Sequence, residues 1–474
     1  MIYLKQRMEF YNRKGMINMK NQFMAGAAKA IITPPLGTKL YGYAFQRLAT
    51  KVNDDLRVNA IAVEQGDLKA ILISADVVSI GEDLFEKVSS LISEETGVPA
   101  KNISISTIHT HSGPTMKTSN GWGSADVSFI NEIFIPQTVA AAKEAVANLT
   151  PAVMGVGTTH SEVGVNRREM TQDGKIILGQ NPYGIFDPTM TVVSFKGLDG
   201  APIANMIHYG CHGTSAGRNP EITRDWPGVM VDRMENETGA LTLFFNGGEG
   251  DVGPRLSNGQ TTGDSKDWTK TDEPTGSMQY VNELGSLAAL DAIRAYKSIK
   301  DYSEVTFMAE SDILRLPYDP QWSREAAEAR LNELNAKDKL IEVENREYAK
   351  VAAIVDMYKN NVPFETHKEI KQTIFAFNSV AIVPFHFEFF SEIGLRMRKY
   401  SPFAHTLCTC NTHGSDFYLP TEDQLVRGGY EIDIFRLANV YKLVDNTDTV
   451  IINENMRILN KMKPYKIQEK ERYV

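Results

Sequence analysis

Cysteine is scarce in this sequence of 474 residues, which contains only Cys211, Cys408 and Cys410. A low and odd number of cysteines excludes a disulfide framework and favours a reducing compartment. Long apolar runs are also missing, because no stretch approaches the ~18 consecutive apolar residues that a membrane-spanning helix requires. We therefore expect a cytoplasmic protein without a membrane span.

Positive charge is in deficit, since 59 acidic residues exceed 50 lysines and arginines and give a formal net charge of −9 at pH 7. This sign argues against nucleic acid or an anionic membrane as the main partner. Residues 1–22 lack the apolar segment and cleavage site of a secretory signal, and patterned sequence begins near Met24. We expect an N-terminal extension over 1–22 and one folded domain over 23–474.

The remaining composition, with 42% hydrophobic and 23% charged residues, is that of a soluble globular protein. Segments rich in β-branched residues predict strands at 56–65, 68–78, 103–107, 191–195, 203–210, 240–245 and 374–385. Helical spacing of apolar residues predicts helices at 82–97, 126–149, 279–299 and 388–400. The turn at Gly66–Asp67 predicts a hairpin between the first two strands. The expected fold is α/β, with mixed β-sheets flanked by helices.

Two segments stand outside this pattern. Residues 254–278 are polar and predict a long loop, which at this length is usually functional or mobile. Residues 322–360 are charged and helical, and predict a helical insertion with one face packed and the other in solvent.

The segment STIHTHSGP, from Ser106, carries the first candidate site. His109 and His111 are two residues apart at the end of a predicted strand, where period-two geometry places both rings on one face. One ring could bind a metal while the other handles a proton. Core packing gives no reason for two histidines in H-x-H followed by a Gly113–Pro114 turn. The pattern therefore favours a functional site.

The segment HYGCHGTS carries the second candidate site. His208 and His212 are four apart, as in the helical zinc motif H-E-x-x-H, but Gly210 and Gly213 argue against a helix. Only one of the two histidines is then expected to be a ligand. Cys211 alternates to the other side of the strand and is expected to be a small buried residue.

The C-terminal half of the sequence contains further candidate site residues. Glu388 lies at a junction of strand and helix, where it could complete a His/His/Glu zinc site, whereas Glu392 is expected on the helix surface. His386 is a possible group next to the ligands. Tyr418 and Tyr430 are twelve residues apart, and the sequence alone assigns catalysis to neither.

The glycines in GGEGDVGPR match the dinucleotide pattern G-x-G-x-x-G, but Pro254 and a polar loop follow instead of a helix. No Gly-Lys-Ser/Thr follows either, so a phosphate-binding loop is not expected. What remains is a turn that holds Asp251 near a strand end, from where its carboxylate could orient a metal-binding histidine.

Taken together, and in their order along the chain, these segments resemble the N-terminal catalytic domain of the neutral/alkaline (non-lysosomal) ceramidase family. GAAKAIITPPLG resembles its opening strand, and HTHSGP is its most specific motif. The other matching segments follow in family order to about residue 435: GVNRR, HGTS, GDVGPR, EFFSEIGLRMR and YLPTEDQLVRGGYE. The resemblance implies that 23–474 is a zinc hydrolase catalytic domain.

The resemblance also implies roles for residues of this chain. In that family one zinc ion is bound by two histidines, a glutamate and a tyrosine, which correspond here to His109, His212, Glu388 and Tyr418. The second histidine of H-T-H carries catalysis, which points to His111. The family's arginine corresponds to Arg167, and its second tyrosine corresponds to Tyr430. Both are expected to contact the reacting carbonyl or its oxyanion.

Two departures bear on the substrate. Ceramidases carry a serine in G-D-V-S-P where this chain has Gly253, so a hydroxyl contact is lost and space is gained. Ceramidases also carry a C-terminal immunoglobulin-like domain, for which the roughly forty residues after Tyr430 are too few, since such a domain takes ~100 residues. We expect no such domain and a substrate other than ceramide itself.

The sequence therefore predicts a zinc-dependent hydrolase, an amidase that cleaves an N-acyl bond of a small molecule with an acyl or carbonyl group. An esterase, lactonase or sugar-directed hydrolase on the same Zn²⁺ site is the first alternative. A non-catalytic metal- or ligand-binding relative is the second, and a nucleotide-binding oxidoreductase is a distant third. The oligomeric state stays open.

Overall fold

The larger of two stacked sheets has eight strands in the order β14-β12-β11-β8-β1-β5-β6-β7. The computed structural model describes residues 21–43, 47–118, 123–257 and 276–462. The strands of this sheet are β1 (Met24–Ile31), β5 (Arg57–Gln65), β6 (Leu68–Ala75), β7 (Ile103–Thr107), β8 (Thr150–His160), β11 (Thr189–Gly197), β12 (Pro202–Tyr209) and β14 (Leu241–Asn246). Parallel pairs β6–β7 and β12–β14 occur beside antiparallel ones, so the sheet is mixed.

The smaller sheet packs against one face of the larger. Its four strands are β16 (Phe307–Pro317), β17 (His367–Phe377), β18 (Val380–Pro384) and β20 (His405–Thr409). Because side chains alternate along a strand, one face of each sheet contributes apolar side chains to a core that the two sheets share. Phe195 of the larger sheet contacts Phe377 of the smaller one, with ring centroids 5.9 Å apart.

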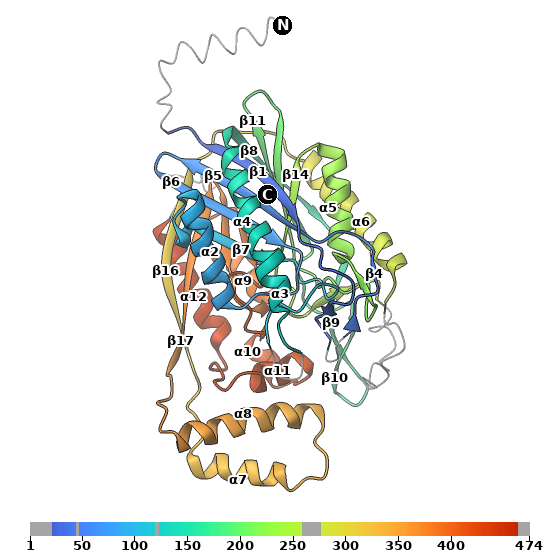
Figure 1. The fold of residues 1–474 in the computed structure, drawn as a ribbon, viewed down its shortest axis with the longest axis vertical. Helices are drawn as coiled ribbons and strands as arrows, with labels where there is room; N and C mark the ends of the chain where they lie inside the picture. Colours follow the sequence, from blue (N-terminus) through green and yellow to red (C-terminus); the bar gives the residue numbers. More distant parts are fainter. Residues whose placement is uncertain (1–20, 44–46, 119–122, 258–275, 463–474) are drawn as a thin grey trace, which may run out of the picture.

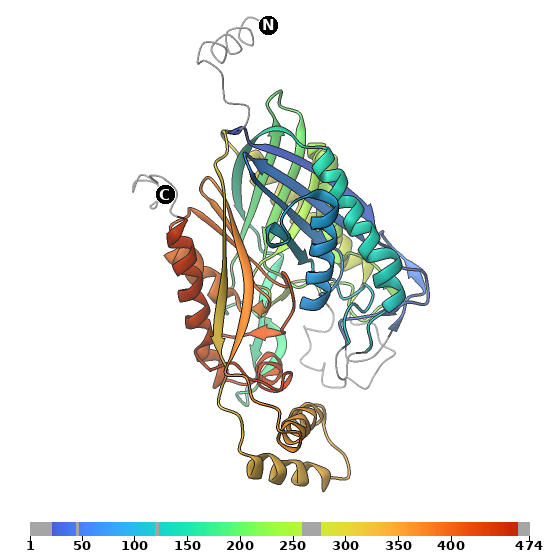
Figure 2. The same ribbon diagram turned by 60° about the vertical axis from the view of Figure 1, so that its left-hand side comes forward.

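Helices cover the two outer faces, which gives four layers (Figure 2). The larger sheet is covered by α2 (Glu82–Thr96), α4 (Ile135–Ala147), α5 (Asp225–Thr238) and α6 (Met278–Lys297). The smaller sheet is covered by α9 (Ser391–Tyr400) and α12 (Thr447–Lys461). The expected α/β fold with mixed sheets flanked by helices is confirmed. No helix among the described residues is long and apolar enough to cross a membrane.

Shorter elements surround the end of the molecule at which the site forms. They are β2 (Lys39–Leu40), β3 (Arg47–Leu48), β4 (Lys51–Val52), β9 (Gly164–Met170), β10 (Ile176–Asn181), β13 (Glu221–Ile222), β15 (Val252–Pro254), β19 (Glu388–Phe389), β21 (Tyr418–Leu419), α3 (Val127–Phe129), α10 (Glu422–Leu425) and α11 (Tyr430–Leu437). Beyond α11, α7 (Arg324–Asn335) and α8 (Glu342–Lys359) form a helical pair at one end of the molecule (Figure 1).

Several local predictions are confirmed, and two differ in detail. β5 and β6 form the predicted hairpin around Gly66, which has a φ of 63°. The helix expected over 126–149 is interrupted by a π-helical turn, Ile130–Phe134, because the ring of Pro136 and its missing N–H disturb the preceding turn. The strand expected over 374–385 is a hairpin that turns at Asn378, whose φ is 53°. Residues 258–275 of the expected polar loop lie outside the described residues.

The strands at the two sides of the larger sheet approach each other at their carboxyl ends. Ser74 Oγ of β6 donates a hydrogen bond to Phe244 O of β14 at 2.6 Å. At the ends of the strands, Asn246 Nδ2 donates to Ile108 O at 3.3 Å. This curvature brings the segments that follow β7, β12 and β14 together at one end of the sheet.

Candidate metal centre

The predicted site residues converge where parallel strands of both sheets end. His109 follows β7 and His212 follows β12, both from the larger sheet. Glu388 follows β18 of the smaller sheet, and Tyr418 joins it because β19 and β21 pair in parallel with Glu388 opposite Tyr418. Four segments that are far apart in the sequence therefore meet in one place.

The H-T-H segment bends away from its strand. β7 ends at Thr107, and His109 has a left-handed backbone with a φ of 63°. The expectation that strand periodicity places both rings on one face is therefore wrong. The turn at His109 instead brings its Nε2 to 3.2 Å from His111 Nε2, and such strained positions collect at functional sites.

Backbone carbonyl groups fix the tautomers of two histidines. His109 Nδ1 donates to Val78 O at 2.9 Å, and His212 Nδ1 donates to Glu249 O at 2.9 Å. Each Nε2 therefore carries a lone pair, as in metal-binding histidines whose other nitrogen is held by a carbonyl. His212 Nε2 has no hydrogen-bond partner among the described residues, whereas His109 Nε2 lies 3.2 Å from His111 Nε2. Burial lowers the pKa of His109, and it lowers that of His212 to about 4, so both rings are neutral near pH 7.

The carboxylate of Glu388 faces these two nitrogens. Its Oε2 lies 3.5 Å from His109 Nε2 and 3.2 Å from His212 Nε2. Burial opposes ionisation of Glu388, but His109, His212 and Arg167 outweigh it and lower the pKa of this carboxyl to about 2. The group is a carboxylate at neutral pH.

These atoms form a set that fits a metal ion. His212 Nε2 and Glu388 Oε2 are buried and have no hydrogen-bond partner among the described residues. Ligand atoms that bind zinc tetrahedrally at ~2.0–2.1 Å lie about 3.3–3.4 Å from one another, close to the spacings observed. The nearby His111 belongs to the same group, because ligand atoms of His109, His111 and His212 all lie within 4.8 Å of one another.

Arg167 connects the metal centre to a buried acid. Its Nη2 donates to the phenol oxygen of Tyr418 at 2.9 Å, and its Nε donates to Glu431 Oε1 at 2.8 Å. Arg168 shares the same carboxylate through Glu431 Oε2 at 2.7 Å. Burial raises the pKa of Tyr418, whereas Arg167 opposes that shift by favouring the phenolate.

Tyr430 and His111 lie on the accessible side of the cluster. The rings of Tyr430 and Tyr418 are 5.8 Å apart between centroids. Both tyrosines, together with His109, His111 and Glu388, line a cavity of about 40 Å³. This volume accommodates an ion or a water molecule next to the cluster.

The acid that supports the histidines differs from the predicted one. The carboxylate of Asp251 accepts hydrogen bonds from Ser391 N at 2.7 Å and Asn166 Nδ2 at 3.1 Å, so the expectation that it orients a histidine is wrong. Glu249 takes that position, because its carbonyl holds His212 and its carboxylate is 4.0 Å from His109 Nδ1. Sequence reasoning missed Glu249, although an acid between two glycines was a usable signal.

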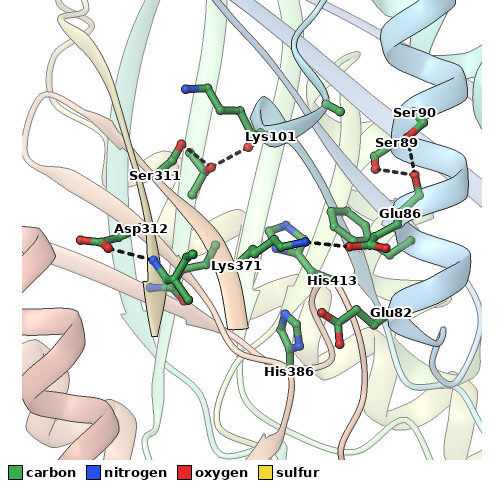
Figure 3. Close-up of a pocket in the computed structure, with 15 residues that line it drawn as sticks. Glu82, Glu86, Ser89, Ser90, Lys101, Ser311, Asp312, Lys371, His386 and His413 are labelled. Carbon is green, nitrogen blue, oxygen red and sulfur yellow. Dashed lines mark hydrogen bonds and ion pairs between the residues drawn. The ribbon is translucent and has the colours of Figure 1, made fainter. Parts of the chain in front are cut away.

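Two other histidines lie apart from the cluster. His208 Nε2 donates to Cys408 O at 2.8 Å, which leaves His212 as the ligand candidate of that pair. His386 faces His413 in a separate cavity beside α2 (Figure 3), with ring centroids 6.1 Å apart. Cys211 is fully buried, as expected.

Gly253 lies in β15, opposite Val165 of β9, and is buried. The loop before it leads into this short strand and not into a helix, which agrees with the rejection of a dinucleotide fingerprint. Among the described residues that line the 40 Å³ cavity, Gly253 does not occur.

Comparisons with known proteins agree with this architecture. The family model described as neutral/alkaline non-lysosomal ceramidase, N-terminal, matches residues 23–307. The structure of neutral ceramidase from Pseudomonas aeruginosa is similar with a TM-score of 0.69 and 16% identity, over 94% of this chain and 76% of that chain. A ceramidase complexed with C2 gives 0.66 and 16%, over 94% and 77%. No curated protein matches the chain.

The predicted family is thus confirmed. At 16% identity the two structures establish the fold, whereas the family model covers more than half of the sequence. Family and fold support a hydrolase, and three histidines are placed where they could hold a metal ion. The chain belongs to the neutral/alkaline non-lysosomal ceramidase family.

Proposed function

We propose that this protein is a zinc-dependent amidase that cleaves the N-acyl bond of a small molecule. The observation that carries the proposal is the meeting of His109 Nε2, His212 Nε2 and Glu388 Oε2, three lone-pair donors with no proton donor among them. Such a set is costly when buried unless a cation binds it. Two histidines and a glutamate are a common ligand set of catalytic zinc.

In this proposal His109, His212, Glu388 and Tyr418 hold the metal. When bound, zinc lowers the pKa of a water molecule to about 7 and polarises a carbonyl group. His111 Nε2 lies 3.2 Å from His109 Nε2, and with the metal bound it would accept a proton from the attacking water. The same atom then delivers the proton to the leaving amine. Burial, with His109 and His212 beside it, lowers the pKa of His111 well below its usual value, so the ring is unprotonated at neutral pH.

Arg167 and Tyr430 stabilise the negative charge that develops on the carbonyl oxygen. Arg167 is buried and held by Glu431, so its guanidinium is oriented before the substrate binds. Tyr430 lines the cavity and can donate its phenol proton to the oxyanion. Donors fixed in a site of low dielectric contribute most of such stabilisation.

Hydrolysis of an N-acyl panel by the zinc-loaded protein tests the proposal. The panel contains N-acyl amino acids, N-acyl amino sugars, N-acylsphingosine and aryl esters, with product amine measured by chromatography. As the sequence predicts a substrate other than ceramide, we expect N-acylsphingosine to be a poor substrate. Preferential cleavage of aryl esters would instead favour an esterase on the same site.

A matched pair of histidine variants separates catalysis from folding. His111→Ala is expected to lower kcat by ~10²–10⁴-fold, as for loss of a general base, with zinc still bound. His208→Gln is the control, because His208 lies on β12 but faces Cys408 O. Full activity in His111→Ala, or in metal-free protein, would refute the proposal.

A further inference from the structure

A second, larger cavity lies in front of the metal centre. It has a volume of about 870 Å³ and is lined by the start of α2, residues 116–118, α3, α8 and residues 437–440. One wall is therefore α8, which belongs to the segment 322–360 for which the sequence predicts one packed face and one face in solvent. Figure 1 shows α8 beside α11, whose first residue is Tyr430. We call this cavity the entrance cleft.

The entrance cleft adjoins the 40 Å³ cavity of the metal centre. Lys117 and Phe417 line both the 40 Å³ cavity and the cleft. The two side chains contact each other, with Lys117 Nζ 4.7 Å from the centroid of the Phe417 ring. Phe417 directly precedes Tyr418 in the chain. The Lys117 and Phe417 side chains therefore lie between the metal centre and the cleft, and the cleft is the nearest large space for the rest of a substrate whose carbonyl reaches the metal centre.

The ionisable side chains of the cleft are mostly cationic, although the chain has a net charge of −9. Four cations line it, Lys87, Lys117, Arg346 and Lys350, against a single acid, Asp83. Such a local excess of one sign concentrates ligands of the opposite sign.

The three lysines of the cleft donate to neutral oxygens. Lys117 Nζ donates to Ser415 O at 2.6 Å, Lys350 Nζ to Arg436 O at 2.8 Å and Lys87 Nζ to Asn131 Oδ1 at 3.1 Å. Two acids that act on Lys117 and Lys350 from outside the cleft are paired with other lysines. Asp416 pairs with Lys368 at 3.0 Å, and Asp319 pairs with Lys442.

Two of these lysines are partly removed from water. Burial lowers the pKa of Lys117, and burial together with Lys442 lowers the pKa of Lys350 to about 8. Burial makes the charged form of both ammonium groups less favourable. An anion bound beside the two lysines would favour the charged form again.

Apolar side chains share the cleft with the cations. Met116, Ile130, Ala353 and Leu437 line it, as does Phe417. The combination fits a ligand with a hydrocarbon part and a negative charge, and neither a neutral lipid nor an uncharged sugar uses both features.

Resting on the proposed amidase function, we propose that the substrates are anionic N-acyl amides, whose acidic group binds Lys350 and Lys117 in the entrance cleft. The acyl chain lies along the apolar residues, and the amide carbonyl reaches the metal centre. A carboxylate and a phosphate share this recognition chemistry.

Matched substrates test the charge requirement. N-dodecanoylglycine carries a carboxylate, N-dodecanoylglycinamide is its neutral counterpart, and N-dodecanoyl-2-aminoethyl phosphate carries a phosphate. We expect kcat/KM for at least one anionic substrate to exceed that for the neutral one at least tenfold, mainly through KM. The comparison between the two anions identifies the preferred acidic group.

A lysine pair on one helix tests the residue assignment. Lys350→Met is expected to reduce the ratio of anionic to neutral kcat/KM at least fivefold. Lys359→Met, an exposed lysine at the end of the same helix, is expected to leave the ratio unchanged. Equal use of charged and neutral substrates, or a ratio that Lys350→Met does not alter, overturns the inference.

Calorimetric binding of N-dodecanoylglycine and of its amide to the His111→Ala variant distinguishes the two proposals. If no compound is hydrolysed by wild-type protein but the anion still binds more tightly, the amidase proposal fails and the anionic cleft stands. If hydrolysis occurs without charge preference and binding shows none, the cleft inference fails and the amidase proposal stands.

Discussion

Two backbone carbonyl oxygens determine which imidazole nitrogens are free at the metal centre. Val78 O and Glu249 O accept the Nδ1 protons of His109 and His212, so both Nε2 lone pairs face Glu388. A side chain that could rotate would hold this arrangement less firmly than a carbonyl fixed in the backbone. The metal-binding chemistry therefore depends on backbone positions as much as on the ligands.

The position of His111 depends on a close approach by Gly42. A Cβ at Gly42, whose φ is 109°, would lie 2.3 Å from His111 Cγ. We expect Gly42→Ala to displace the ring and lower kcat by ~10²-fold, since ångström-scale misplacement has effects of this size. Gly37→Ala is the control, because Gly37 has a φ of 89° and open space at Cβ. Both variants store backbone strain of ~1–3 kcal/mol, so equal kcat values in the two would contradict the assignment.

Glu431 is the single carboxylate that Arg167 and Arg168 share. Removal of its charge leaves two buried guanidinium groups without their partner, which typically costs ~3–5 kcal/mol. We therefore expect Glu431→Gln to lower the melting temperature and, through a misoriented Arg167, kcat. Glu422→Gln, at an exposed acid of α10, is the control for thermal unfolding. Unchanged stability of Glu431→Gln would show that the arginines find other partners.

At the scale of elements, sequence patterns predict most strands and helices because apolar periodicity is local. The hairpin β5–β6 and helix α2, which ends at Gly97 with a φ of 71°, follow from such patterns. The bend at His109 does not, because a left-handed histidine is held by its surroundings and not by its own propensity. Strand periodicity therefore predicts that the two rings of H-T-H lie close together, but for the wrong geometric reason.

Other parts of the site depend on contacts between distant elements. The pairing of Glu388 with Tyr418 arises from two short parallel strands that no local pattern marks. Glu249 and Glu431 support the site through partners that are 37 and more than 260 residues away, so sequence spacing does not point to them. The motifs predict the residues at the centre, whereas the residues that orient them require the fold.

The helical pair α7–α8 lies between β16 and β17 in the chain. The pairing of these two strands ends with Pro317 opposite His367. Replacement of residues 322–362 by a short Gly–Ser linker should therefore preserve the β16–β17 ladder. We expect the shortened protein to bind zinc as before, because no described residue of the pair lines the 40 Å³ cavity. It should lose discrimination between N-dodecanoylglycine and its amide. Retained discrimination would show that α8 contributes nothing to specificity.

At the scale of the whole molecule, the metal centre joins the two sheets. His109 and His212 follow strands of the larger sheet, and Glu388 follows a strand of the smaller one. If the proposed metal binds here, it would stabilise the folded state by ~2.7 kcal/mol at a free concentration 100 times Kd. We expect zinc to raise the melting temperature of chelator-treated wild-type protein and His208→Gln but not of His109→Ala. An equal shift in all three would indicate binding elsewhere.

Anomalous scattering from zinc-loaded crystals would show where the metal binds. Crystals of the zinc-loaded protein, measured on both sides of the zinc absorption edge, give an anomalous difference map that is specific for zinc. The account predicts one strong peak ~2.0–2.2 Å from His109 Nε2, His212 Nε2 and a carboxylate oxygen of Glu388. The absence of a peak among these three residues, or a peak bound by other residues, would contradict it.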